Sequence, residues 1–369
     1  MHKKQFFDDR MRYFAFTQNT NEKTKFSELI LPYIENLGHD RSCLRILDAG
    51  TGDGSIMANI IKAFHKYHPT NILSILGKEI SYKDLKNTLD KLSDRFAEHP
   101  RMLVTLTNVK FSQIEQLNVN KKINGKNIKI LKIELSGSTS FDFQNQVMST
   151  AVIKFITRFW GISADNSGNT QYTNPCIIKI YRQDSKEVLF SDNESSQVTN
   201  NFDLIIASQA YRSRSIPERK VKYVISPLAK LLNQSGELLI THSTGGKQVN
   251  EILNTTFNNI NAFPSVAKDL ISQLERESKN DKCQYTSSTP FTYQFSFTQA
   301  PLGMPLELFG REVDAKIESL LYFGQITDQE INTLNGSNER MMKLRESLQA
   351  YPELLFENEF FTLKRLPNR

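Results

Sequence analysis

The sequence predicts an α/β fold built on a doubly wound, mostly parallel sheet. Short apolar strands alternate with amphipathic helices between Leu44 and Thr107, and a glycine-rich turn joins the first strand to its helix. The alternation resumes with a buried strand at Phe202. Because neighbouring parallel strands require a crossover connection, usually a helix, this alternation indicates a parallel sheet with helices on both faces.

The first half of the pattern contains an N-terminal helix followed by three strands. From Phe26 to Leu37, apolar residues recur at spacings of three and four, as in a helix with one buried face. The predicted helices span 24–37, 55–67 and 82–96, and the predicted strands span 44–48, 71–79 and 102–107.

A long segment then interrupts the alternation before it resumes. Residues 115–200 are predicted to form an α+β insertion that caps the substrate site, with strands at 128–135 and 177–181 and one helix face from Val147 to Trp160. The polar run 191–201 is predicted to be a linker back into the sheet. The predicted elements after it are a strand at 202–207, a helix at 221–232, a strand at 237–241, a helix at 265–276, a strand at 291–297, helices at 313–321 and 339–349, and a strand at 360–364.

These elements divide the chain of 369 residues into three parts. Residues 1–114 contain the N-terminal helix and the first half of the ligand-binding domain, 115–200 the insertion, and 201–369 the second half with a C-terminal extension. The length agrees with this division, since single hydrophobic cores stop growing at roughly 250–300 residues.

Composition excludes several classes of protein. The 46 Lys and Arg against 40 Asp and Glu give a net charge of +6, which is mild for this length and does not favour broad nucleic-acid binding. No apolar run approaches the roughly 18–20 residues of a membrane-spanning helix, and acid follows too early at the N-terminus for a signal peptide. The widely spaced Cys43, Cys176 and Cys283 favour neither a disulfide framework nor a zinc site. We therefore expect a cytoplasmic protein with no metal and no membrane partner.

The strongest signal is a glycine-rich segment directly after the first strand. It reads Asp48-Ala49-Gly50-Thr51-Gly52-Asp53-Gly54. A nicotinamide-dependent dehydrogenase would have glycine where Ser55 stands, so its GxGxxG spacing is absent. The DxGxGxG spacing, with an acid at the strand end, resembles motif I of the class I S-adenosylmethionine-dependent methyltransferases. The resemblance implies a Rossmann-like, mostly parallel seven-stranded sheet with an insertion between strands three and four, and S-adenosyl-L-methionine as the cofactor.

Two residues at later strand ends extend this resemblance. Glu79 stands where both dehydrogenases and these methyltransferases place a carboxylate for two ribose hydroxyls. The alternative is that Glu79 is only a first-turn acid of the next helix. Asn108 matches the position that often contacts the adenine amino group, although Asn is also a routine turn residue. The predicted cofactor-binding residues are Asp48, Gly50, Thr51, Gly52, Gly54, Glu79, Asn108 and Ser208.

The resemblance continues from Phe202 to Thr244 and looks like a bacterial branch without an assigned substrate. The C-terminal region resembles that of histamine N-methyltransferase-like enzymes. The loop Ser208-Gln209-Ala210-Tyr211 departs from the (D/N)PP(Y/F) motif used for exocyclic amines of bases, which disfavours an adenine-N6 or protein-glutamine methyltransferase. Cys176 follows Pro175, as in cytosine-C5 enzymes, but lies upstream of the fourth strand, so a nucleophilic role is disfavoured.

Acceptor-side candidates follow the fourth and fifth strands, because ligands of such sheets bind outside the carboxyl ends of the strands. Gln209 and Arg212 are predicted to bind the substrate. Tyr211 and His242 are predicted to serve as the base if the acceptor must lose a proton. For His242 the alternative is a strand-end histidine bonded to backbone, and for Tyr211 it is packing in a lid.

Three further features leave alternatives open. Trp160, with Phe155 and Phe159, either caps the substrate pocket or belongs to the core. Tyr13 and Phe14 stand where many relatives close over the cofactor. A basic cluster either grips an anionic substrate or a nucleic acid, or is a solvated helix start; its members are Arg212, Arg214, Arg219, Lys220 and Lys222.

The sequence thus predicts methyl transfer to nitrogen or oxygen of a small molecule. The alternatives are an RNA, tRNA or protein methyltransferase and an inert cofactor-binding module. The oligomeric state is not predicted.

Overall fold

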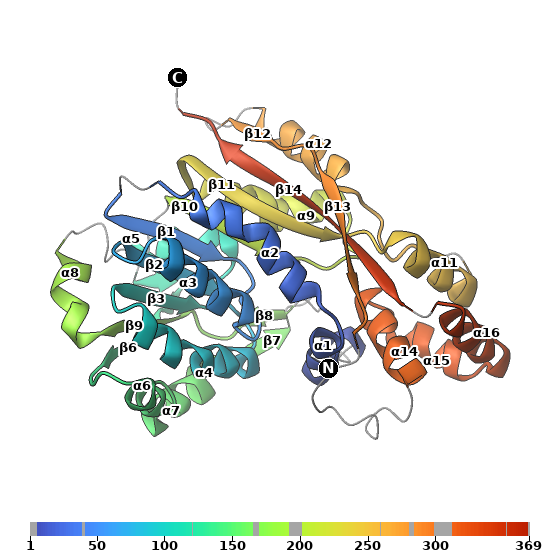
Figure 1. Ribbon diagram of the computed structural model, residues 1–369, viewed down its shortest axis with the longest axis horizontal. Helices are drawn as coiled ribbons and strands as arrows, with labels where there is room; N and C mark the ends of the chain where they lie inside the picture. Colours follow the sequence, from blue (N-terminus) through green and yellow to red (C-terminus); the bar gives the residue numbers. More distant parts are fainter. Residues whose placement is uncertain are drawn as a thin grey trace.

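The computed structural model describes residues 6–38, 41–119, 121–164, 170–191, 201–258, 260–279, 284–298, 312–351 and 353–367. A twisted sheet runs through it with helices against both faces (Figure 1). The α/β class with a mostly parallel sheet is as predicted. None of the helices in these segments is long and apolar enough to cross a membrane.

Five parallel strands form the centre of the sheet, in the order β3-β2-β1-β10-β11. They are β1 (Cys43–Asp48), β2 (Ile72–Lys78), β3 (Met102–Thr107), β10 (Phe202–Ser208) and β11 (Leu232–Ser243). The chain order reverses beside β1, and in open α/β sheets a ligand crevice forms at such a switch point, outside the carboxyl ends of the strands.

The sheet extends beyond this centre at both edges and has ten strands in the described part of the chain, not seven. On one side β14 (Leu355–Arg365) pairs antiparallel with β11 and carries both β12 (Tyr285–Ser287) and β13 (Phe291–Ser296). On the other, β9 (Cys176–Arg182) pairs antiparallel with β3 and parallel with β6 (Lys129–Leu135).

The insertion therefore contributes strands to the central sheet. Most of β9 is buried on both of its faces, and an apolar strand of this kind needs hydrogen-bonded neighbours on each side. The two small hairpins of the insertion lie off the sheet; they are β4 (Lys122–Ile123) with β5 (Lys126–Asn127) and β7 (Ile162–Ala164) with β8 (Thr170–Tyr172).

Helices cover the two sheet faces and the carboxyl edge. The α-helices are α1 (Arg10–Asn19), α2 (Glu22–Glu35), α3 (Ser55–Tyr67), α4 (Tyr82–Glu98), α5 (Gln116–Val119), α6 (Ser140–Val147), α7 (Thr150–Phe159), α8 (Lys186–Phe190), α9 (Pro217–Lys220), α10 (Ser226–Lys230), α11 (Gly246–Phe257), α12 (Ala267–Ser278), α14 (Glu312–Phe323), α15 (Asp328–Asn335) and α16 (Asn338–Gln349). Short 3₁₀ turns occur at η1 (Phe6–Asp8), η2 (Phe111–Gln113) and η3 (Gln183–Ser185), and a π-helical turn, η4 (Val221–Ile225), joins α9 to α10.

Two helical predictions were wrong in detail. The single face predicted from Val147 to Trp160 is divided between α6 and α7, because Ser149 is extended at the start of α7. The helix predicted at 221–232 begins at Pro217 and ends at Lys230, so β11 starts five residues earlier than predicted.

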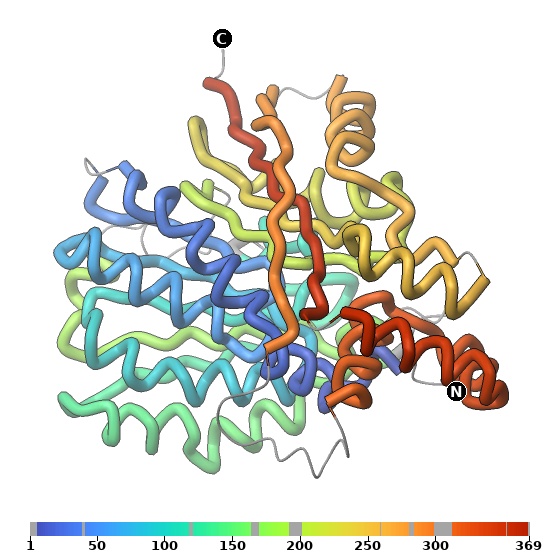
Figure 2. Tube along the Cα trace, turned by 45° about the vertical axis from the view of Figure 1, so that its right-hand side comes forward, coloured from blue at the N-terminus to red at the C-terminus, as the bar shows by residue number. Residues whose placement is uncertain are grey.

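Three apolar clusters hold these layers together. One joins α2, α3, α4, α6 and α7 to one sheet face, and a second joins η4, α10 and α12 to the other. The third brings the two ends of the chain together, since Phe16 of α1 stacks on Phe323 of α14 at 5.8 Å between ring centroids. The N-terminal and C-terminal helices accordingly lie side by side (Figures 1 and 2).

Gly54, at the start of α3, lies where α3 packs closely against α4. It adopts φ +80°, and a β-carbon there would lie 2.7 Å from the backbone Cα of Thr88 in α4. Gly54→Ala is expected to lower the free energy of unfolding by about 3 kcal/mol, combining left-handed strain with overpacking. The measurement is urea unfolding followed by circular dichroism.

Gly125 is the matched control for this substitution. It also has positive φ, +76°, but a β-carbon there meets nothing within 4 Å. Gly125→Ala is expected to cost only the backbone strain, about 1 kcal/mol. Equal losses in the two variants would contradict the packing argument.

Candidate functional site

A cavity of about 420 Å³ lies at the carboxyl ends of β1, β2 and β10. This size is typical of a site for a small ligand or cofactor. Its walls come from the glycine loop after β1, the loop after β10, the N-terminal helices and the end of α14. None of the lining residues belongs to 115–200, so among the described residues the cap over this cavity is formed by the two ends of the chain.

The glycine loop is bent tightly at the end of β1. Gly50, Gly52 and Gly54 all have positive φ, and Gly52 donates its backbone N–H to Glu79 Oε2 at 2.8 Å. A β-carbon at Gly52 would lie 2.7 Å from the Tyr13 hydroxyl. Tyr13 therefore covers this loop and lines the cavity, whereas Phe14 does not line it.

Asp48 is the most unusual group beside the cavity. Its side chain is buried, with 1% exposed, and neither carboxylate oxygen has a hydrogen-bond partner among the described residues. Burial, with the nearby charges of Glu79 and Asp53, raises the pKa of this carboxyl to about 7, although the Thr51 side chain and the charge of Lys23 oppose the rise. A buried carboxylate without hydrogen bonds lowers the stability of the folded protein, unless a ligand supplies a hydrogen-bond donor or a cation.

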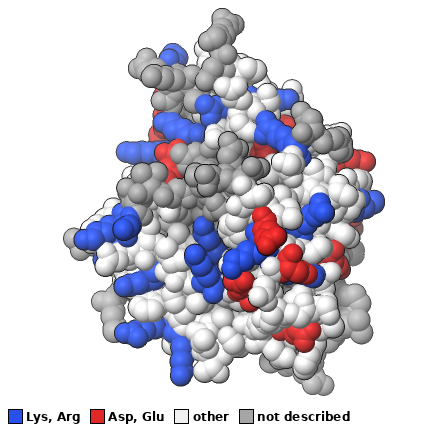
Figure 3. Space-filling view, turned by 90° about the vertical axis from the view of Figure 1, so that its left-hand side faces the viewer, with Lys and Arg blue, Asp and Glu red and all other residues white. Residues whose placement is uncertain are grey.

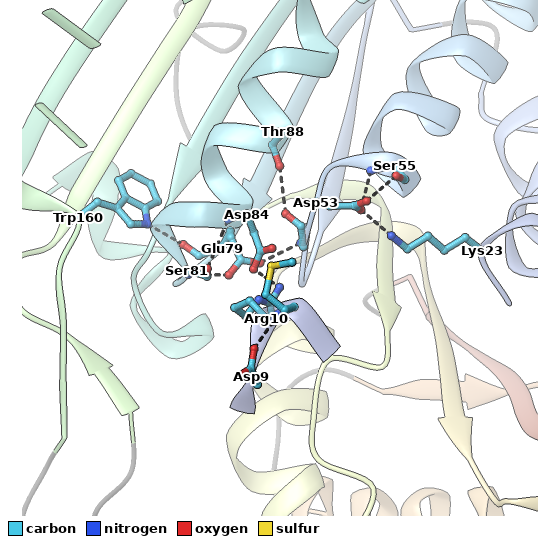
Figure 4. Close-up of polar contacts among 12 residues, drawn as sticks. Asp9, Arg10, Lys23, Asp53, Ser55, Glu79, Ser81, Asp84, Thr88 and Trp160 are labelled. Atoms are coloured by element: carbon cyan, nitrogen blue, oxygen red, sulfur yellow. Dashed lines mark hydrogen bonds and ion pairs between the residues drawn. The ribbon is translucent and has the colours of Figure 1, made fainter. Parts of the chain in front are cut away.

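Glu79 stands directly after β2 and braces the glycine loop (Figure 4). Besides the bond from Gly52, its Oε1 accepts the backbone N–H of Ser81 at 2.7 Å. Each carboxylate oxygen has a further lone pair for a ligand hydroxyl. Trp160 donates its indole N–H to the backbone oxygen of Glu79 at 3.1 Å. It is 1% exposed and does not line the cavity, so the structure places it in the core behind Glu79 rather than against a substrate.

Ion pairs fasten the N-terminal helices to the loop (Figure 4). Lys23 of α2 lies 2.6 Å from Asp53 Oδ1, and Lys91 of α4 lies 3.2 Å from Asp53 Oδ2. Although burial opposes it, these ammonium groups lower the pKa of Asp53 to about 2. Arg10 of α1 pairs with the buried Asp84 of α4. The cover over the loop is thus held by charge as well as by aromatic packing.

A second acid, the half-buried Glu22 of α2, also lines the cavity. Its Oε1 accepts from Asn358 Nδ2 at 3.1 Å and lies 3.4 Å from Gln209 Nε2. Burial raises the pKa of Glu22, while these amide contacts and Lys23 oppose the rise. No hydrogen bond to its Oε2 occurs within the described residues. Glu22 and Gln209 line the cavity, and Gln209 is fixed by Ser243 Oγ, which donates to its Oε1 at 2.8 Å.

The structure does not bring Asn108 to this cavity. Its amide nitrogen donates to Asn174 O at 3.0 Å, and its oxygen accepts the Cys176 N–H at 2.9 Å. Because β9 pairs beside β3, the Asn108 carboxamide ties these strands together. Burial raises the pKa of the neighbouring Cys176 thiol to about 12, which is unfavourable for a nucleophile.

The two predicted bases have different positions. Tyr211 lines the cavity, whereas His242 is fully buried and absent from the lining. His242 Nε2 donates to Ser265 O at 2.7 Å, as in the backbone-bonded alternative. Burial and Lys220 lower the pKa of His242 to about 4. His242 therefore does not contact a ligand in this cavity.

The predicted basic cluster is dispersed. Arg212 lines the cavity but pairs with Asp8 at 2.8 Å, Arg214 pairs with Glu330 at 2.8 Å, and Lys220 is buried. Arg219 and Lys222 are exposed. Figure 3 shows another face, the left-hand side of the molecule in Figure 1, where basic side chains predominate toward the left and acidic ones lie beside basic ones over the middle. The five residues do not form one continuous basic surface.

Of the remaining predicted residues, Gly50, Thr51, Gly52 and Ser208 line the cavity. Gly54 is not among the lining residues and is the N-cap of α3. No group of three or more potential metal ligands occurs among the described residues.

Sequence reasoning missed Glu22, Lys23, Asn358 and Tyr322. Glu22 and Lys23 reach the site through packing of α2 against α3 and β13, Asn358 through pairing of β14 with β11, and Tyr322 through packing of α14 against α1. No local motif marks such long-range contacts.

Comparison with known proteins finds solved structures of low similarity. No family model matches the sequence, and no curated protein matches it. A methyltransferase candidate from Bacillus halodurans is 10% identical, with 91% of this chain and 97% of that chain covered and a TM-score of 0.38. The [4+2]-cyclase SpnF is 11% identical, with 93% and 82% covered and a TM-score of 0.37. Phosphoethanolamine N-methyltransferase 2 of Haemonchus contortus is 11% identical, with 92% and 52% covered and a TM-score of 0.35. At these scores the function has to be inferred from the residues of the site itself.

Proposed function

We propose that this chain binds S-adenosylmethionine and transfers its methyl group to the nitrogen of a small amine. The observation that carries the proposal is the buried Asp48 carboxylate, which stands on the glycine loop with neither oxygen hydrogen-bonded by the described residues. A cationic ligand at this end of the cavity would relieve its burial. The cofactor's amino-acid end carries such a cation, and its ribose offers two hydroxyls to Glu79.

The acceptor half is proposed from Glu22. Asp48 ends β1 and Glu79 follows β2, whereas the partners of Glu22 belong to the loop after β10 and to β14. We therefore assign Asp48 and Glu79 to the cofactor and Glu22 to the acceptor. Carboxylate and aromatic walls suit an ammonium group, through charge and cation–π attraction. The aromatic lining residues are Tyr13, Phe16, Phe26, Phe111, Tyr211, Tyr322 and Phe323.

The chain's own contribution to the reaction is binding and orientation. When bound, the cofactor supplies a methyl group on a positively charged sulfur. Glu22 would hold the acceptor and take up the proton that its ammonium group must lose before the nitrogen lone pair can accept the methyl group. Gln209 would fix the Glu22 carboxylate, and the helices at the cavity would exclude water. Positioning of this kind contributes much of the rate of a displacement reaction.

Calorimetric titration with S-adenosylmethionine and S-adenosylhomocysteine tests the cofactor half. The wild type is expected to bind with a Kd of about 1–100 µM, typical of such a cofactor site, and NADH is expected not to bind. Gly52→Arg, which fills the loop, and Glu79→Ala are expected to lose binding. Gly125→Arg, at an open hairpin position, is the matched control and should bind normally. Failure of the wild type to bind either sulfur compound would overturn the proposal.

Turnover separates the remaining alternatives. Release of S-adenosylhomocysteine is measured with 2-phenylethylamine, histamine and bulk tRNA as acceptors. Turnover with an amine supports the proposal, and turnover with tRNA alone supports the nucleic-acid alternative. Binding without turnover on any acceptor supports an inert module. A cytoplasmic location and the division at 115 and 200 stay predictions.

A further inference from the structure

Behind the cavity wall formed by Tyr211 lies a buried polar cluster that the proposed reaction does not use. Lys220, at the end of α9, is 1% exposed. Its ammonium donates to Ser213 O at 2.9 Å and to Ser265 Oγ at 2.8 Å. Burial of an amine costs free energy of folding, whereas burial of an apolar side chain at the same place would not. Stability alone therefore does not explain a lysine at this position.

Lys220 connects three segments around the acceptor end of the cavity. Ser213 belongs to the loop after β10, which also carries Gln209 and Tyr211. Ser265 precedes α12, and its backbone oxygen accepts the N–H of His242 at the end of β11. One side chain therefore ties the loop that lines the cavity to the two segments behind it.

The cluster also touches the wall residue directly. The Lys220 nitrogen lies 5.3 Å from the centroid of the Tyr211 ring, within range of a cation–π contact, and the His242 ring lies 5.8 Å from it. Tyr211 has no hydrogen bond from its hydroxyl within the described residues, so ring contacts and loop position fix its side chain.

Two further observations mark this region as more than core packing. The helix changes to π-helical hydrogen bonding at Val221, immediately after Lys220, and such turns are frequent at functional sites. In addition, Ser213 Oγ and His242 Nδ1 are buried without hydrogen-bond partners among the described residues. Buried polar atoms without hydrogen-bond partners lower stability, so their concentration around one buried amine indicates a functional reason for the cluster.

We propose that Lys220 is a positioning residue for the methyl acceptor, which acts through the Tyr211 ring and through the loop that carries Gln209. The inference rests on the proposed function, because it assigns the acceptor to this end of the cavity. Lys220 contacts neither ligand. Protonated Lys220 donates stronger hydrogen bonds than the neutral amine and attracts the Tyr211 ring. The charge of Lys220 therefore determines how strongly the Tyr211 side chain and its loop are fixed.

Burial lowers the pKa of Lys220 to about 7, so this charge changes near neutrality. The groups that face the cluster from neighbouring elements are His242 of β11, Asp269 of α12 and Glu359 of β14. The pKa of His242 is lowered to about 4, and Glu359 accepts the Ala267 N–H at 2.6 Å. Asp48, beside the same cavity, also has a pKa of about 7, so the titration is followed in an Asp48→Asn background, where a change in the Tyr211 environment near pH 7 reports Lys220.

The test compares Lys220→Met with Lys222→Met, an exposed lysine two residues away, each in the Asp48→Asn background. The Tyr211 ring resonances, assigned with Tyr211→Phe, are followed by ¹H–¹³C NMR from pH 5.5 to 9. We expect a titration with a midpoint near 7 in Asp48→Asn alone and with Lys222→Met that is absent with Lys220→Met. No titration in Asp48→Asn alone, or a titration that survives with Lys220→Met, would overturn the inference. This readout needs neither ligand, so it is independent of the proposed function.

Kinetics supply the second measurement, with S-adenosylmethionine as donor and 2-phenylethylamine as acceptor. Lys220→Met is expected to raise the acceptor KM about tenfold with kcat within about threefold, as for lost positioning of a ground-state contact. Its affinity for S-adenosylhomocysteine should match that of the wild type. Loss of S-adenosylhomocysteine binding in Lys220→Met alone would show a general structural role and count against the inference. Absence of binding in the wild type would instead overturn the proposed function and leave the NMR result to decide.

Discussion

Asp48→Asn is expected to weaken binding of S-adenosylhomocysteine by at least about 30-fold, or about 2 kcal/mol, while it makes the ligand-free protein more stable. The two effects have one cause. Neither oxygen of the Asp48 carboxylate is hydrogen-bonded within the described residues. Its charge therefore destabilises the ligand-free protein, and the same charge stabilises a bound cationic ligand. Calorimetry measures the first effect and thermal unfolding the second.

The pH dependence of stability follows from the raised pKa of Asp48. The folded state favours the protonated carboxyl, since its pKa rises from the model-compound value of 3.8 to about 7. The unfolded state thus binds fewer protons between these values, and the Asp48 contribution to stability is lost as pH rises from about 4 to 7. At about 1.4 kcal/mol per pH unit the full difference is about 4 kcal/mol, an upper bound for the gain from asparagine. In Asp48→Asn this part of the pH dependence should disappear.

Asp53→Asn is the control of opposite sign on the same loop. Lys23 and Lys91 hold the pKa of Asp53 at about 2, so its charge stabilises the folded state above pH 4 and that contribution is lost as pH falls toward 2. Asp53→Asn should therefore lower the melting temperature at pH 7. If Asp48→Asn is also destabilised at that pH, the Asp48 carboxylate is satisfied in the folded protein and the cofactor argument fails.

The local part of the fold was predictable because it depends on short-range pattern. The predicted strand 44–48 and helix 55–67 match β1 and α3 to within a residue, since apolar runs and glycine spacing determine both. Glu79 was found for the same reason, at a fixed distance after the glycine loop.

The rest depends on contacts that no local pattern encodes. Asn108 and His242 stand at strand ends as predicted, but β9 pairs beside the first and the segment before α12 packs against the second, so neither faces the cavity. Glu22 and Asn358 meet although they are 336 residues apart, because β14 pairs antiparallel with β11 beneath α2. The insertion was predicted to cap the substrate site, and none of its described residues lines the cavity. Its strand β9 has the apolar sequence of a buried sheet strand, and sequence alone does not give its partner.

Glu22→Gln is expected to abolish the use of amine acceptors, with kcat/KM reduced about 100-fold or more, while binding of S-adenosylhomocysteine changes less than about threefold. Glutamine keeps the size of Glu22 and its acceptor oxygen, so the contacts from Asn358 and Gln209 can persist without the charge. Measurement of methyl transfer to 2-phenylethylamine, beside calorimetry of the same preparation, separates the two halves of the cavity.

Glu28→Gln is the matched control, because Glu28 lies on the same helix, is exposed, and pairs only with Lys25 among the described residues. It should behave as the wild type. The raised pKa of Glu22 adds a pH signature: since the ionised carboxylate binds the ammonium, acceptor affinity should rise with pH through that pKa in the wild type and stay level in Glu22→Gln. If both variants lose cofactor binding equally, α2 supports the fold only. If Glu22→Gln keeps full activity, the acceptor is held elsewhere and an amine is no longer the favoured substrate.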